Sequence, residues 1–240
     1  MKFFTKHPRL LSALYILSLL ISITIIILVW LLRGLNEDYK YIITFILLIV
    51  TMVITLMFKA HWDSYLFQYK LSRLINLKSG ICHTKSKLTK TFIEQNLKSS
   101  GIHEKILIED TEVYYDVLTG GNHFDRHGSL YVVISPSNYA EFTNERLNLV
   151  LNHIETILSR KKTKFKNFNI ITLQYVDGIK NDTIKLADYV VFHQERNNHL
   201  SSINLIIDTT NDAYYYLNSK KYSPNSHYQN LCNFVQKMVD

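Results

Sequence analysis

Residues 10–32 read LLSALYILSLLISITIIILVWLL and contain no charged side chain. At about 1.5 Å per residue, a helix over this stretch reaches roughly 34 Å, which is enough to cross a hydrocarbon core of about 30 Å. Residues 41–58 read YIITFILLIVTMVITLMF and form a second uncharged run, flanked by aromatic side chains that suit a membrane interface. The two runs predict a transmembrane hairpin whose helices are joined by the short loop 33–40.

A cleavable signal peptide is the main alternative for the first run, because Lys2, Lys6 and Arg9 precede it. The run is longer than the usual apolar region of a signal peptide, no small-residue cleavage site follows it, and another apolar run comes at once. A buried pair of globular helices is also disfavoured, since core helices are rarely apolar on every face over this length. The sequence therefore predicts two membrane spans.

The distribution of Lys and Arg predicts the sidedness of the hairpin. Three such residues precede the first run and seven lie in residues 59–90, whereas the loop between the runs holds two. Because basic segments stay on the cytoplasmic side, we expect a cell-membrane protein with residues 1–9 and the C-terminal domain in the cytoplasm. The cations expected at the anionic membrane surface are Lys59, Lys70, Arg73 and Lys78.

The formal net charge of +7 is unevenly distributed, since residues 91–159 hold four bases against ten acids. Nucleic acid is therefore not expected as a partner. The two cysteines, Cys82 and Cys232, lie far apart without metal-ligand spacing, so we expect free thiols in a reducing compartment.

After the hairpin, residues 59–101 predict a stalk and helical connector. Apolar side chains recur at helical intervals from Trp62 to Ile75, before Gly80 can end the helix. A shorter helix follows, and Thr91 lies at capping-box spacing from a glutamate near its start.

Residues 102–240 predict a cytoplasmic α+β domain. Residues 105–135 alternate at the strand period and indicate three strands. Apolar residues at helical spacing over 147–158 predict an amphipathic helix capped by Thr143. Further strands are expected over 168–176, 189–193, 203–208 and 214–217, and a last helix that opens at Ser223 and Pro224. The order of elements predicts a mixed β-sheet packed by helices.

The loop over residues 119–128 is the richest polar group in the domain. His123, Asp125 and His127 are side chains that can bind a transition metal, and Arg126 with backbone amides can hold a phosphate. Two histidines in a loop lack the fixed geometry that the same spacing has on a helix, so a solvated hairpin loop is the favoured interpretation. We therefore predict no metal and no cofactor.

A second polar turn holds His193, Glu195, Arg196 and His199. His193 and Glu195 join the first loop as candidates for acid-base catalysis if the fold brings both turns to one edge, with Arg196 as a ligand-binding candidate. His193 equally suits a solvent-facing strand position. Asp208, at the end of an apolar strand, suits either a functional carboxylate or a turn.

Two further groups have a simple structural explanation. Bases from Arg160 to Lys166, mixed with Phe165 and Phe168, resemble single-stranded nucleic-acid sites, but they also suit a helix end followed by a core strand. An acidic run over residues 109–116 suits a charged strand as well as a metal site.

The sequence contains no phosphate-binding loop, dinucleotide fingerprint, nucleophile elbow or zinc-protease motif. We therefore expect a membrane-anchored cytoplasmic interaction or regulatory module, a non-catalytic subunit of a membrane-associated complex, in preference to an enzyme. The alternative is a membrane-tethered hydrolase or nucleotide-responsive effector that uses the loop from His123 to His127. The expected partners are the lipid bilayer and a protein, including a second copy of the chain; a small-molecule ligand is left open.

Overall fold

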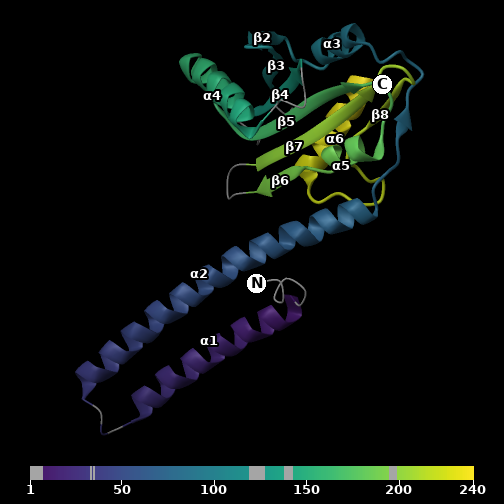
Figure 1. Ribbon diagram of the computed structural model, residues 1–240. Coiled ribbons are helices and arrows are strands. Elements are labelled where there is room, and N and C mark those ends of the chain that lie inside the picture. The colour runs from purple at the N-terminus through teal and green to yellow at the C-terminus, as the bar shows by residue number, and fades with distance from the viewer. Residues whose placement is uncertain (1–7, 33, 35, 119–127, 138–142, 195–198) are drawn as a thin grey trace. The chain divides into compact units, whose positions relative to one another are not determined.

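The computed structural model describes the chain except for residues 1–7, 33, 35, 119–127, 138–142 and 195–198 (Figure 1). The chain divides into two compact units, Met1–Lys70 and Leu71–Asp240. The first is helical, and the second is built on a β-sheet.

The first unit holds α1 (Pro8–Leu31) and most of α2 (Glu37–Asn76), which run antiparallel (Figure 1). The ring of Tyr15, in the first half of α1, stacks on Phe58 at 4.1 Å between centroids. At the other end of the pair, Trp30 meets Tyr41 edge to face at 5.4 Å. Serine and threonine hydroxyls within the helices bond the preceding turn, as Ser22 Oγ does with the carbonyl of Ser18 at 3.0 Å.

Among the described residues, α2 is long and apolar enough to cross a membrane. The apolar stretch Tyr15–Leu31 of α1 is shorter than the usual membrane span. The prediction of two spans is therefore not established by the helix lengths. The continuation of the second apolar run into a longer helix is confirmed, since α2 extends through Lys59 as far as Asn76.

The second unit contains one eight-stranded mixed sheet, which confirms the predicted α+β class with a mixed sheet packed by helices. The strands are β1 (Cys82–His83), β2 (Glu104–Ile108), β3 (Thr111–Leu118), β4 (Gly128–Pro136), β5 (Phe165–Val176), β6 (Val191–Gln194), β7 (His199–Asp208) and β8 (Ala213–Tyr215).

The sheet has the strand order β1-β8-β7-β5-β4-β3-β2, with β6 paired to β7 off this path. Three central strands, β4, β5 and β7, are parallel, and the remaining pairs are antiparallel. β6 pairs with the first residues of β7 and β8 with its last residues, so the two short strands share one edge of β7.

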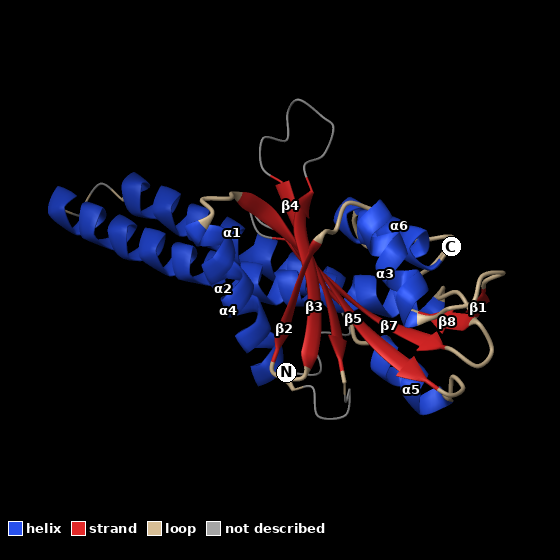
Figure 2. Cartoon of the chain, turned by 90° about the horizontal axis from the view of Figure 1, so that it is seen from above, coloured by secondary structure: helices blue, strands red, loops and turns tan. Residues whose placement is uncertain are grey.

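Helices cover both faces of the sheet (Figure 2). They are α3 (Lys90–Ser99), α4 (Asn144–Arg160), α5 (Asn181–Ala187) and α6 (Ser226–Val239). Val150, Ile154 and Leu158 of α4 pack on the face of β4 that carries Leu130 and Val132. Successive strand residues point to opposite faces, so Tyr131 faces the other way, and its ring lies 4.6 Å from Phe234 of α6.

Local signals explain where the helices begin. Thr143 caps α4, as predicted, because its hydroxyl accepts the backbone N–H of Arg146 at 3.4 Å. The start of α3, which the sequence left open near Thr91, lies at Thr89, whose hydroxyl accepts from the N–H of Phe92. The predicted opening of the last helix at Ser223 and Pro224 is wrong. Asn225 caps α6 instead, because its carboxamide oxygen accepts from the N–H of Tyr228 at 2.7 Å.

The expected strands of the domain are confirmed with shifted bounds. The strand predicted over 189–193 is β6, which begins at Val191, while Tyr189 precedes it and is 78 % exposed. The one predicted over 214–217 is β8, which ends at Tyr215. Two elements, β1 and α5, were not predicted.

Candidate functional site

The strands that follow the two histidine-bearing segments begin at the same end of the sheet. His123, Asp125, Arg126 and His127 lie outside the described residues, and so do Glu195 and Arg196. The residues that follow these turns, Gly128 and His199, begin β4 and β7, two parallel strands on either side of β5. Gly128 and His199 therefore lie at the same end of the sheet, separated by the single strand β5.

His193 lies on β6, where its Cα is paired with that of Leu200 and its side chain is exposed. This is the solvent-facing strand position considered from the sequence. His199 lies at the start of β7, and its ring stacks on His227 of α6 with centroids 3.5 Å apart and planes 20° apart. The structure thus places His199 against α6 and His193 at the surface.

Buried polar side chains continue from His199 across the face of the sheet that α6 covers. Asn167 and Asn169 of β5 and Ser201 of β7 are 7 %, 5 % and 1 % exposed. The amide of Asn167 donates to Ser129 Oγ of β4 at 3.0 Å. These amide, hydroxyl and imidazole groups supply hydrogen bonds, and among the described residues no group of three or more His, Cys, Asp or Glu side chains could hold a metal ion.

The buried polar row was not predicted from the sequence, although the sequence of β5 contains a signal for it. Asn167 and Asn169 occupy alternate positions of β5, between residues that pack beneath α4. Polar residues at every second position of an otherwise apolar strand indicate one polar face.

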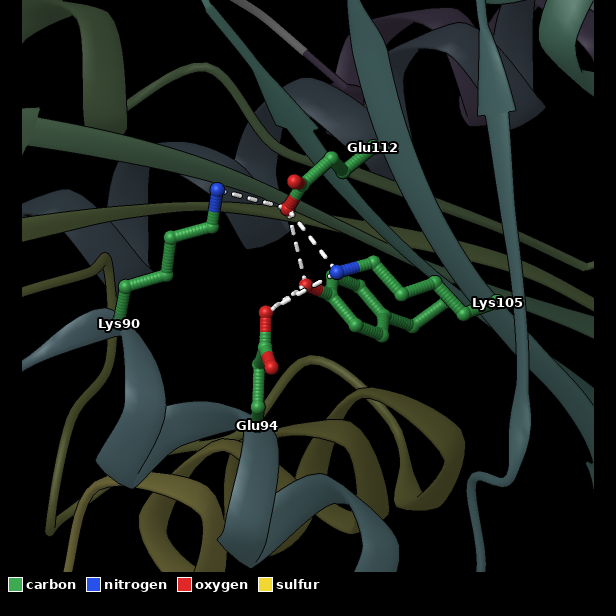
Figure 3. Close-up of polar contacts among 5 residues, drawn as sticks. Lys90, Glu94, Lys105 and Glu112 are labelled. Carbon is green, nitrogen blue, oxygen red and sulfur yellow. Dashed lines mark hydrogen bonds and ion pairs between the residues drawn. The ribbon is translucent and has the colours of Figure 1, made fainter.

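A charged cluster joins α3 to the edge of the sheet (Figure 3). The Tyr114 hydroxyl of β3 lies 2.5 Å from Glu94 Oε1 of α3 and 2.9 Å from Glu112 Oε2. Lys90 contacts Glu112 at 2.8 Å, and Lys105 contacts Glu94 at 3.1 Å and Glu112 at 3.5 Å. Two carboxylates are thus matched by two ammonium groups, which is the arrangement of a structural network.

The network shifts the pKa values of Glu94, Glu112 and Tyr114. The hydrogen bond from Tyr114 holds the pKa of Glu94 below its ordinary value, and the hydrogen bond from Lys90 does the same for Glu112. Burial and the two carboxylates raise the pKa of Tyr114 far above the usual range of a phenol. Tyr114 therefore stays protonated and donates its one proton within the cluster.

Acidification is expected to weaken the contact between α3 and the sheet. Because the folded pKa values of Glu94 and Glu112 are lowered, their contribution to stability is complete above the unfolded value of about 4.3 and is lost as the pH falls through the folded values.

Tyr114→Phe should raise the pKa of Glu94, as measured by NMR titration of the carboxyl carbon. Tyr115→Phe, on the opposite face of β3, is the control, and an equal shift in both variants would contradict the assigned cause.

The four cations predicted at the membrane surface have different environments. Lys59 is exposed on α2 and Lys70 is half-buried. The guanidinium of Arg73 lies 4.5 Å from the centre of the Tyr222 ring. The ammonium of Lys78 forms an ion pair with Asp188 at 2.8 Å, so this lysine joins the connector to the domain.

Two other sequence candidates have structural roles. Asp208 is 2 % exposed and accepts hydrogen bonds from the N–H groups of Thr210 and Asn211, which is the turn role considered for it. Phe165 and Phe168 pack against the core beneath α4, where their rings meet edge to face at 4.9 Å.

Comparison of the chain with protein-family models, with curated proteins and with solved structures finds no match. The function is therefore inferred from the geometry of the chain itself.

Proposed function

We propose that this chain is a membrane-anchored interaction or regulatory module. Its α1–α2 hairpin sits in a cell membrane and holds the second unit at the cytoplasmic surface, where it contacts a protein partner. The observation that carries this proposal is the uncovered apolar surface of both helices.

Many apolar side chains of both helices are exposed. Ile16, Leu20 and Ile27 of α1 are 56 %, 55 % and 54 % exposed, and Phe45 and Met52 of α2 are both 65 % exposed. Monomeric soluble proteins rarely leave contiguous apolar patches larger than a few hundred Å² in water. Lipid tails are the simplest cover for two neighbouring helices that are apolar all round.

Aromatic rings mark both ends of the proposed hairpin. The pair Tyr15 and Phe58 and the pair Trp30 and Tyr41 are separated by about 22 Å along α1 and about 26 Å along α2, at about 1.5 Å per residue. These separations are about 4–8 Å less than a hydrocarbon core of about 30 Å, so each ring pair would lie about 2–4 Å inside the margin of the core, near the interface where tyrosine and tryptophan are enriched. This spacing supports the proposal that α1 spans the membrane together with α2.

The hairpin is tested by placing charge at its centre. An arginine at the centre of each helix, Leu20→Arg with Leu48→Arg, should remove the chain from the alkaline-washed membrane pellet, because each arginine costs about 2.5–3.5 kcal/mol at the centre of a span. Leu149→Arg is the matched control, since Leu149 is a 44 % exposed leucine of α4, and this variant should stay in the pellet. Release of the unmodified chain by the alkaline wash would refute the membrane anchor.

The second unit offers an apolar surface for a partner. Leu186, Tyr189 and Val191 are 45 %, 78 % and 38 % exposed. The amide of Asn204 donates to the carbonyls of Leu186 and Tyr189 at 3.1 and 3.0 Å, which fixes the backbone that carries them. Exposed aromatic and aliphatic side chains on a fixed backbone are typical of interaction surfaces.

A further inference from the structure

A pocket of 410 Å³ lies between the connector that precedes α3, strand β8 and helix α6. Pockets for small molecules usually measure about 300–1,000 Å³, so this one has room for a compact ligand. Ser79, Cys82 and His83 line it from the connector, and Tyr214 and Cys232 line it from β8 and α6. We call this the tyrosine pocket, because four of its lining residues are Tyr214, Tyr216, Tyr222 and Tyr228.

The inner wall of the tyrosine pocket is already formed. The hydroxyl of Tyr228 donates to the carbonyl of Leu217 at 2.5 Å, and that of Tyr216 donates to the carbonyl of Cys232 at 3.3 Å. The rings of Tyr214 and Tyr216 are nearly parallel, with centroids 6.2 Å apart and planes 12° apart. A ligand would therefore meet a fixed aromatic wall and would pay little to order it.

The rim of the tyrosine pocket is polar and nearly neutral. Among the described lining residues, Lys220 and Asp240 bring one charge of each sign. The amides of Asn218, Gln229 and Gln236 line the same pocket, as do the serine residues Ser219 and Ser223. A carboxamide both donates and accepts hydrogen bonds, which suits hydroxyl groups of a ligand. The lining residues carry no excess of positive or negative charge that would favour a strongly charged ligand.

We propose that the tyrosine pocket binds a small uncharged molecule with several hydroxyl groups, of the size of a monosaccharide or a nucleoside. Such a ligand would contact the connector and the domain at once. Beside the pocket, the connector is held by the two-residue pairing of β1 with β8 and by the hydrogen bond from the Ser79 N–H to the Asn218 carbonyl at 2.7 Å. The ion pair of Lys78 with Asp188 and the hydrogen bonds of Thr84 and Leu88 to Asp212 hold it further along the chain. Binding would therefore tighten the attachment of the connector, a property beyond membrane anchoring.

The two cysteines provide a reporter within the full chain. Cys82 is half-buried in the pocket, whereas Cys232 is 8 % exposed and burial raises its pKa to about 12. N-ethylmaleimide should therefore react with Cys82 first, because the thiolate is the reactive form. The Cys232→Ala variant makes the assignment unambiguous, since the chain has two cysteines.

The experiment measures the rate of Cys82 alkylation in detergent-solubilised chain, with glucose in one arm and adenosine in the other. At ten times its Kd, a bound probe should slow alkylation by about tenfold, and the arm that responds identifies the source of the hydroxyl groups. The protection should persist at about 1 M salt, where charge interactions are screened within about 3 Å.

Variants show whether the protection arises in the tyrosine pocket. Asn218→Ala with Gln236→Ala should abolish it, whereas Asn148→Ala, an exposed amide on α4, should leave it intact. Unchanged alkylation in both arms would overturn the proposal. Protection by inorganic phosphate that disappears at high salt would also overturn it, because the site would then be an anion site at Lys220.

Discussion

A chain that lacks residues 1–60 is expected to leave the membrane fraction completely while its domain stays folded. The cut removes α1 and the apolar part of α2, which are the segments proposed to lie in lipid. It keeps the last turns of α2, in which Leu74 is fully buried in the second unit. Membrane flotation measures the first effect, and circular dichroism with urea unfolding measures the second.

A longer cut provides the control for this truncation. Removal of residues 1–80 also deletes Leu74, the ion pair between Lys78 and Asp188, and the hydrogen bond from Ser79 to Asn218. Loss of a buried leucine alone costs about 2–5 kcal/mol, so this fragment should be markedly less stable than the first. A molten, aggregated fragment after the shorter cut would argue against an autonomous domain.

Gly128→Ala is expected to destabilise the domain by about 1–3 kcal/mol, the usual cost of overpacking a core. A Cβ at this position would lie 2.4 Å from Val117 Cγ1 and 3.2 Å from the carbonyl oxygen of Leu118. Both belong to β3, the antiparallel neighbour of β4, so relief requires a shift between two paired strands. The midpoint of thermal unfolding should fall by roughly 2–4 °C for each kcal/mol lost.

Gly80→Ala is the matched control for this substitution. Nothing lies within 4 Å of a Cβ built at Gly80, so the variant should unfold at the temperature of the unmodified chain. Equal stability of the two variants would show that β3 and β4 relax without cost around Gly128.

The longer elements of the fold were predictable because their periodicity is repeated several times. The apolar stripe of α4 continues over 17 residues, and β5 and β7 are runs of 12 and 10 residues. α5 has seven residues and β1 has two, which is too few for a period to emerge. The true caps of α3 and α6 were missed because Thr89 and Asn225 have polar neighbours that are equally good candidates in the sequence.

The candidate sites were harder to predict than the elements. The sequence drew attention to polar loops, whereas the buried polar row on β5 and β7 arises from strands whose registers place Asn167 beside His199. The tyrosine pocket likewise combines Cys82 with residues near 214–236, which only the pairing of β1 with β8 brings together. Contacts over such separations depend on topology, and local patterns carry no information about them.

The pairing of Cys82 with Tyr214 also has a consequence for biosynthesis. At about 5–20 residues per second, a ribosome needs roughly 7–26 s to make the residues between them. The sheet cannot be closed before that time, while both apolar helices have long been translated. With the hairpin as the proposed membrane anchor, the nascent chain should engage the membrane first and complete its domain afterwards, so that the domain folds on a polypeptide already tethered at one end.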